Sequence, residues 1–122
     1  MALTGKKVEV SLFIDPDVDQ VKCAKSLGAD TIELHTGKYA NMQGPAKALE
    51  LARLQRAAEL ALKLKLHLHA GHGLDYRNVV PVARLPGMQE LNIGFSIISR
   101  AVFVGLGEAV QEMKRIIACA ES

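Results

Sequence analysis

The stretch from Leu66 to Gly73, LHLHAGHG, decides the fold class of this chain. Its first five residues alternate apolar and imidazole side chains, which is the period of a β-strand with one apolar and one polar face. Glycines flank His72 directly after the strand, and glycine lets a ligand approach the backbone closely. The stretch therefore predicts a half-buried strand that ends in a loop accessible to a ligand.

Three other runs resemble this strand, and helical sequence follows each of them. Thr36 and Gly37 are expected to begin a loop, and Gly28 is expected to end the first helix. The order predicts parallel strands with right-handed crossovers in one structural unit over residues 1–122. Strands are expected over Val8–Ile14, Thr31–His35, Leu66–Ala70 and Glu90–Ile93; helices are expected over Pro16–Leu27, Pro45–Leu64, Ser96–Val104 and Gly107–Ala120, with a short irregular or helical stretch around 78–85.

The two faces of the expected sheet differ in polarity. An open sheet with helices on both sides needs two apolar faces, whereas a barrel turns one face to its helices and the other to its lumen. We therefore predict an α/β fold, the (βα)₄ half of a TIM (βα)₈ barrel. The apolar set is Val8, Val10, Leu12, Ile14, Ile32, Leu34, Leu66, Leu68, Ala70, Leu91 and Ile93; the polar set is Glu9, Ser11, Asp15, Thr31, Glu33, His35, His67, His69, Glu90 and Asn92.

Four strands cannot close a barrel, so the sheet is expected to have two unpaired edges and an uncovered polar face. Unpaired strand edges favour association with another chain. We therefore expect a homodimer or higher homo-oligomer, or association with a complementary half-barrel.

Composition excludes several classes of partner. Apolar residues make up 49% and charged residues 23% of the 122 residues, and the net charge of +2 is spread without a basic cluster, so no nucleic-acid partner is expected. The apolar run Ile97–Leu106 is shorter than the ~20 residues that span a membrane. With no signal-like N-terminus, a cytoplasmic location is expected. Cys23 and Cys119 are expected to be small buried or half-buried side chains.

Three residues at the expected strand ends are candidates for a functional site, because barrels place their sites there. His72 is expected to be an exposed proton donor or acceptor, or else an inert loop histidine. Glu33 faces the lumen and either binds a ligand hydroxyl or amine or pairs with an imidazole. Gly94, ahead of a helix starting near Ser96, is either a phosphate cradle or a tight turn.

A metal site on the same polar face is the weaker alternative. His67 and His69 share one strand face, and Glu33 and His35 lie on the adjoining strand. Imidazoles and a carboxylate suit zinc or similar ions, but no motif of known ligand spacing is present. We therefore expect neither a metal nor another cofactor.

Five motifs at these strand ends resemble the pyridoxine 5′-phosphate synthase family. The likeness runs from about Val8 to Ile117 and corresponds to strands five to eight, the C-terminal half of the family barrel. The family condenses 3-amino-2-oxopropyl phosphate with 1-deoxy-D-xylulose 5-phosphate, without a metal, in the biosynthesis of vitamin B6 and pyridoxal phosphate. The motifs are Val10–Asp15 (VSLFID), Glu33–Gly37 (ELHTG), Ala70–Leu74 (AGHGL), Glu90–Gly94 (ELNIG) and Arg100–Leu106 (RAVFVGL).

The resemblance implies a role for each candidate residue. His72 matches the family's proton-transferring histidine, and Glu33 matches a substrate-binding glutamate. Gly73 and Gly94 match backbone donors to a substrate phosphate. The position after Gly94 is usually histidine, and here it is Phe95, whose backbone N–H can still serve a phosphate while its ring lies at the pocket mouth.

The resemblance also implies what this half lacks. The family's catalytic glutamate and a further histidine belong to the first half of the barrel, and the position before Ala70, usually asparagine, is His69 here. The expected ligand is a phosphorylated small molecule or inorganic phosphate, and the chain alone is not expected to be active. Two readings stay open: an enzyme part that works with a complementary half, or a non-catalytic, self-associating half-barrel that binds only phosphate or metal.

Overall fold

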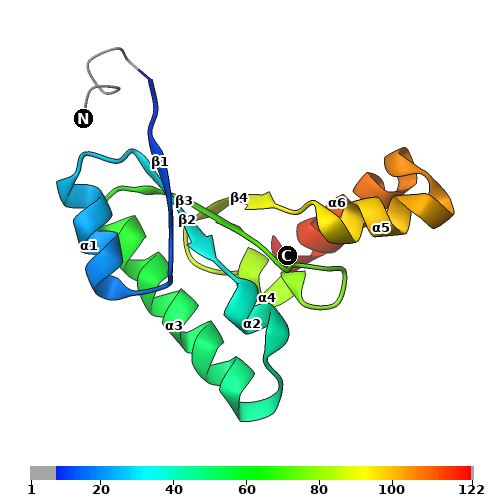
Figure 1. Cartoon of the computed structure of the whole chain (residues 1–122), viewed down its shortest axis with the longest axis horizontal. Coiled ribbons are helices and arrows are strands. Elements are labelled where there is room, and N and C mark those ends of the chain that lie inside the picture. Colours follow the sequence, from blue (N-terminus) through cyan, green and yellow to red (C-terminus); the bar gives the residue numbers. More distant parts are fainter. Residues whose placement is uncertain (1–7, 122) are drawn as a thin grey trace.

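A parallel sheet in the order β1-β2-β3-β4 forms the centre of the molecule in the computed structural model, which describes residues 8–121 (Figure 1). All three strand pairs are parallel, and helices separate successive strands along the chain. The expected α/β class and the expected parallel strand order are therefore confirmed. The strands are β1 (Ser11–Ile14), β2 (Thr31–His35), β3 (His67–Gly71) and β4 (Met88–Asn92).

The helices follow the expected positions closely, with one addition. Asp17 caps the first of them by accepting hydrogen bonds from the N–H groups of Asp19 and Gln20, and Gly28 ends it with a φ of 80°. The additional helix is α2, in the segment that was expected to be a loop. The bounds are α1 (Val18–Ser26), α2 (Gly37–Asn41), α3 (Gly44–Lys63), α4 (Val79–Ala83), α5 (Phe95–Val104) and α6 (Leu106–Glu121).

The loop expected after Thr36 was a wrong prediction, because tertiary contacts stabilise a short helix there. Tyr39 in α2 is 2% exposed, and its hydroxyl donates a hydrogen bond to the carbonyl oxygen of Asn78 at 2.8 Å. Burial raises the pKa of Tyr39, and the nearby Asp75 raises it further. The phenol therefore stays protonated throughout the neutral range and can act as this donor.

Two smaller expectations were also wrong. The strand expected from Val8 begins only at Ser11, because the Asp30 carboxylate, rather than a neighbouring strand, accepts the hydrogen bond from the Val10 N–H at 3.0 Å. Cys23 and Cys119 are exposed rather than buried. On α1, Val21 and Ala24 occupy the core-facing positions, and Cys23 therefore turns towards solvent.

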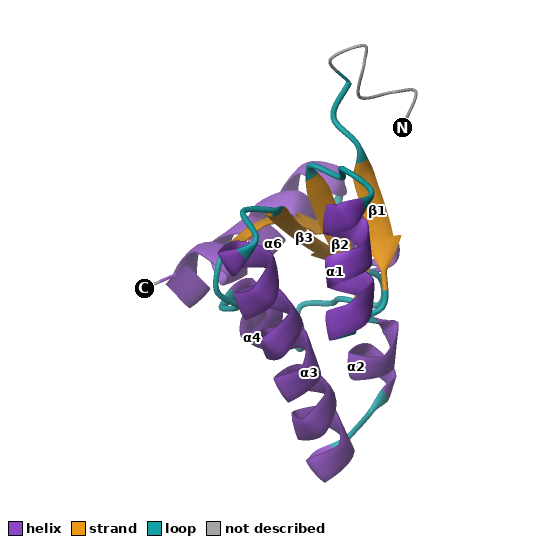
Figure 2. Cartoon of the chain, turned by 90° about the vertical axis from the view of Figure 1, so that its left-hand side faces the viewer, coloured by secondary structure: helices purple, strands orange, loops and turns teal. Residues whose placement is uncertain are grey.

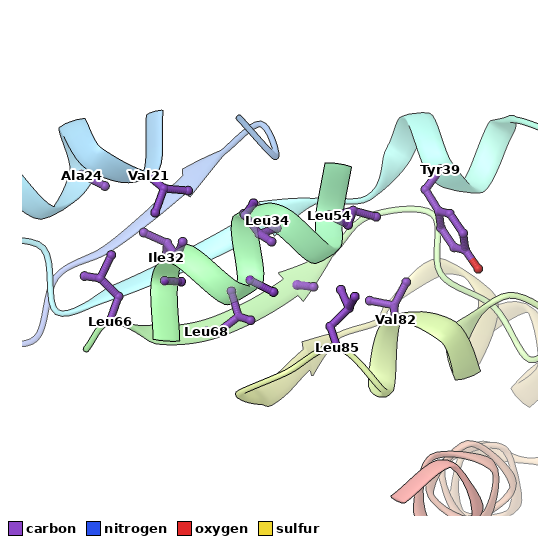
Figure 3. Close-up of a cluster of buried hydrophobic side chains, with 14 of the residues drawn as sticks. Val21, Ala24, Ile32, Leu34, Tyr39, Leu54, Leu66, Leu68, Val82 and Leu85 are labelled. Atoms are coloured by element: carbon purple, nitrogen blue, oxygen red, sulfur yellow. The ribbon is translucent and has the colours of Figure 1, made fainter. Parts of the chain in front are cut away.

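The two faces of the sheet have the expected difference in polarity. Helices α1 and α3 lie together on one side of the strands (Figure 2). Their side chains bury Ile32, Leu34 and Leu68, which are at most 1% exposed, between sheet and helices (Figure 3). The opposite face carries half-buried or exposed polar side chains, with Thr31 as a buried exception. It also carries Phe13, an aromatic residue that the polar set did not include.

Leu54 of α3 provides a test of this core. Its side chain is fully buried, so Leu54→Ala is expected to lower the free energy of unfolding by about 2–5 kcal/mol. Leu49 lies on the same helix but is 70% exposed, so Leu49→Ala should change that free energy by less than about 0.5 kcal/mol. Urea unfolding followed by circular dichroism measures both. Equal effects of the two substitutions would contradict the packing of α3 described above.

No helix within residues 8–121 combines the length and the apolar character needed to cross a membrane. Helices α5 and α6 instead pack against each other at the end of the molecule away from α1 (Figure 1). In α5 no residue is buried, and the surface of the pair exposes several large apolar side chains.

Candidate functional site

A cavity of about 830 Å³ opens where the carboxyl ends of β3 and β4 meet α2 and the start of α5. This edge of a parallel sheet is where α/β proteins place their ligand sites. The cavity brings together four of the five residues singled out from the sequence. It is lined by His72, Gly73, Gly94 and Phe95, together with the neutral polar side chains of Asn92 and Ser96 and the acidic Asp75.

His72 has an unusual backbone conformation, with a φ of 84°. Non-glycine residues rarely adopt the left-handed region, and it persists where surrounding contacts enforce it. Here Thr36 supplies those contacts. Its hydroxyl lies 2.7 Å from the carbonyl oxygens of both Gly71 and His72, and its N–H donates to the Gly71 oxygen at 2.9 Å. The fully buried Thr36 thereby holds the loop that presents the exposed His72.

The His72 ring is stacked on the ring of His35, which comes from the end of β2. The two ring centroids are 4.7 Å apart and the ring planes differ by 24°. His35 also meets Phe13 of β1 edge-on, with centroids 5.1 Å apart. Three successive strand ends therefore contribute to one row of rings on the polar face.

Two glycines leave room for this arrangement. A Cβ atom at Gly37 would lie 2.5 Å from Cε1 of His35 and 2.9 Å from Cδ2 of His72. A Cβ atom at Gly71 would overlap with Oε1 of Glu33 and would approach the carbonyl oxygen of Asn92 to 2.9 Å. Side-chain packing at the site therefore favours glycine at Gly37 and Gly71. This reason is separate from the close approach of a ligand to the backbone that glycine also permits.

Glu33 is set apart from the other candidate residues. Its half-buried carboxylate lies beside Gly71 on the polar face, and Glu33 does not line the cavity. In the strand register it is level with His69, which in turn is level with Glu90. Glu33 can therefore meet a ligand that extends from the cavity across the lumen-facing side of β2 and β3.

The other side of the cavity is the N-terminus of α5. Gly94 precedes this ten-residue helix, and no side chain caps the helix by hydrogen bonding. The first N–H groups of a helix have no partner within it, and together with the helix dipole they favour an anion. Ser96 ties this end of the helix to the β3 side, because its hydroxyl donates to the carbonyl oxygen of Leu74 at 2.8 Å.

The loop after His72 is fixed by an amide. The Asn78 side chain donates to the carbonyl oxygen of Gly73 at 3.1 Å and accepts from the N–H of Asp75 at 2.8 Å. Gly73 itself has a φ of 75°, and a Cβ there would come within 2.7 Å of the Ala40 Cβ. Gly73 and Gly94 therefore face the same cavity from two anchored segments.

Phe95, the first residue of α5, has a side chain that is 90% exposed. Phe95 lines the cavity, and its exposed side chain does not pack into the core. A substitution there should therefore alter the entrance of the cavity without removing a structural contact.

The metal-site hypothesis finds no support in the geometry. Among residues 8–121, no three His, Cys, Asp or Glu side chains are grouped in a way that could hold a metal ion. His67 instead pairs with the Gln89 side chain at 2.9 Å, and His69 Nδ1 lies 3.8 Å from a Glu90 carboxylate oxygen.

Four residues that hold the site together were not assigned that role from the sequence. His35 was considered only for a metal site and Thr36 only as the start of a loop, and Phe13 and Asn78 were assigned no role. The left-handed backbone of His72 is not visible in the residue type. One usable signal was present, since a β-strand places Glu33 and His35 on the same face.

Comparison with known proteins gives a consistent assignment. The profile of the pyridoxal phosphate biosynthesis protein PdxJ family matches residues 1–119. Proteins named pyridoxine 5′-phosphate synthase are 56% identical to the chain over 114 residues in a Synechococcus species, 58% over 113 residues in a Synechocystis species and 54% over 111 residues in Magnetococcus marinus.

These matches cover 90–93% of the chain but only 46–48% of each relative, so the chain spans about half the length of the curated relatives it matches. Relatives about twice as long fit the expectation that four parallel βα units are half of a TIM barrel. The chain belongs to the pyridoxal phosphate biosynthesis protein PdxJ family.

Proposed function

We propose that this chain supplies half of a phosphate-binding active site for the synthesis of pyridoxine 5′-phosphate, working with a complementary half-barrel. The observation that carries the proposal is the single cavity in which His72 and Gly73 face Gly94 and the uncapped start of α5. A phosphate group bound at the helix start would place the rest of a substrate beside the His72 ring. The family match over residues 1–119 supports the same assignment.

In this proposal the residues have separate roles. His72 transfers a proton at neutral pH, as an exposed imidazole can, and Glu33 binds a substrate hydroxyl or amine on the lumen side. Backbone N–H groups at Gly73, Gly94 and Phe95 hold the phosphate. The substrates are 3-amino-2-oxopropyl phosphate and 1-deoxy-D-xylulose 5-phosphate, and a cytoplasmic location is part of the proposal.

The complementary half is needed because a sheet of four strands leaves the polar face open. Glu33, His35 and His69 are only half-buried, and Glu90 and Asn92 are exposed. Catalysis in barrels draws residues from the ends of several strands around a closed lumen. The chain alone is therefore proposed to bind phosphate without completing the condensation.

Phosphate binding can be tested with two phenylalanines of α5. Phe95→Glu places a carboxylate at the cavity mouth and is expected to weaken binding of inorganic phosphate by about tenfold or more, through like-charge repulsion. Phe103 is 84% exposed near the other end of the same helix, so Phe103→Glu should leave the phosphate Kd within about twofold. Titration calorimetry of the full chain measures both values. Equal weakening by the two variants would contradict a phosphate site at the start of α5.

A non-catalytic, self-associating half-barrel is the second candidate function. The observation that favours it is the apolar surface of α5, where Phe95, Val102 and Phe103 are 79–90% exposed. Exposed apolar patches of this kind mark interaction sites. Growth of a pyridoxine auxotroph that expresses only this chain would exclude the non-catalytic reading.

A further inference from the structure

We infer that His35 is a positioning residue, which sets the orientation of the His72 ring by stacking against it. The inference concerns a residue with no role in the function proposed above, and it rests on that function for its catalytic consequence. Its structural part can be tested without any assay of turnover.

The orientation of the His72 ring needs a contact of its own, because the hydrogen bond that holds this residue involves only its backbone. Thr36 holds the carbonyl oxygen of His72, which leaves the rotation of the imidazole about its side-chain bonds undetermined. His72 is exposed and lies between two glycines. The ring contact described for His72 is the one with His35, at a centroid distance of 4.7 Å.

His35 is itself held from two sides, so it can serve as a fixed platform. Phe13 meets one side of its ring edge-on, and the N–H of Gly37 points at its Nδ1 over 3.4 Å. These contacts fix the ring plane of the half-buried His35. Because the His72 ring stacks on it, the orientation of the His72 ring is fixed as well.

The geometry at Gly37 supports a positioning role for His35, as opposed to a role in which its ring only fills space beside His72. Gly37 is the first residue of α2, and its φ is not in the left-handed region, so its backbone does not need glycine. What excludes a Cβ there is the closeness of Cε1 of His35 at 2.5 Å and Cδ2 of His72 at 2.9 Å. Alanine has a higher helix propensity than glycine, but at this position its Cβ atom would displace the two rings.

Three variants separate stacking from the other properties of His35. His35→Phe keeps an aromatic face but loses the ring nitrogens. His35→Asn keeps a polar side chain but loses the stack. Gly37→Ala keeps His35 and introduces the Cβ that both rings exclude. His67→Asn is the matched control, because His67 pairs with Gln89 at the start of β3 and takes no part in the stack.

The first measurement is the NMR spectrum of the imidazole side chains in the full chain, which has four histidines. We expect the ring protons of His72 to be shifted upfield by the stack in the wild type, in His35→Phe and in His67→Asn. That shift should be lost in His35→Asn and in Gly37→Ala. His72 shifts that stay the same in both of these variants would overturn the inference, and Gly37→Ala decides the outcome if His35→Asn does not fold.

The second measurement uses the chain assembled with the complementary half. His35→Asn is expected to lower kcat by about tenfold with KM changed less than about twofold, because the proton-transferring ring is misplaced after substrate has bound. His35→Phe loses the hydrogen bond from Gly37 but keeps a ring that can stack on His72, so it should retain kcat within about twofold of the wild type. A loss of kcat as large as that of His35→Asn would overturn the stacking role. An unchanged kcat in His35→Asn, together with a lost upfield shift, would overturn the catalytic part of the inference.

The proposed function and the inference fail in distinguishable ways. If His72→Asn retains turnover while His35→Asn still removes the upfield shift of His72, the proposed role of His72 is wrong and the stacking is right. If His72→Asn abolishes turnover and His35→Asn changes neither the shift nor kcat, the positioning role is wrong and the proposed function stands.

Discussion

His72→Asn is expected to lower the rate of pyridoxine 5′-phosphate formation by about 10²–10⁴-fold when the chain works with its complementary half, which is the usual contribution of a general acid or base. Asparagine is the appropriate replacement because it tolerates the left-handed backbone at this position, where φ is 84°. The substitution removes the imidazole without straining the loop that Thr36 holds.

The effect should appear in kcat more than in KM. The phosphate contacts proposed at Gly73, Gly94 and Phe95 come from the backbone, so binding of the phosphorylated substrate does not depend on the imidazole. Steady-state kinetics with purified halves, or growth of an auxotroph that expresses both halves, measures the change. His67→Asn serves as the control and should retain full activity, because His67 is exposed and pairs only with Gln89 among the described residues. A His72→Asn variant with wild-type turnover would assign the proton transfer to another group.

The double substitution Val102→Glu and Phe103→Glu is expected to weaken association of the half-barrel by about hundredfold or more. Both side chains are large, apolar and 79–84% exposed on α5. Burying such a side chain contributes about 1.5–3 kcal/mol, and two of them correspond to at least about 10² in the dissociation constant. Charged replacements on an already exposed surface should leave the fold of the chain unchanged.

Sedimentation velocity over a range of concentrations measures this association. Gln111→Glu with Ala118→Glu provides a control with the same change in charge, because both positions are exposed on α6. The control should associate like the wild type. A wild type that remains a monomer at every concentration, or a double variant that associates normally, would contradict an interface at α5.

These predictions depend on the structure to different degrees. The proposed role of His72 rests on its place after β3 and on the family resemblance, both of which are visible in the sequence. The interface prediction needs the structure, because the pattern of α5 resembles that of a buried helix. Its residues Ile98, Val102 and Phe103 are apolar, yet in the fold none of the α5 residues is buried. Apolar periodicity shows that a helix has an apolar face, and it cannot show whether the rest of the chain covers that face.

The sequence by itself determined the α/β class, the parallel strand order and the difference between the two faces of the sheet. These properties are local, since a strand repeats every two residues and a helix every 3.6. The family motifs added the prediction of which strand ends carry chemistry. The glycines in those motifs predicted a close approach of a ligand to the backbone.

Only the tertiary structure decided which side chains meet. The row of rings joins Phe13, His35 and His72 from three strand ends, and the hydroxyl of Tyr39 reaches Asn78 across 39 residues of chain. Such contacts depend on strand register, in which a shift by one residue would turn each side chain to the opposite face. That register is set by the packing of helices and strands across the whole core. For this reason His72 could be proposed from its motif, whereas its contacts with His35 and Thr36 became visible only in the folded chain.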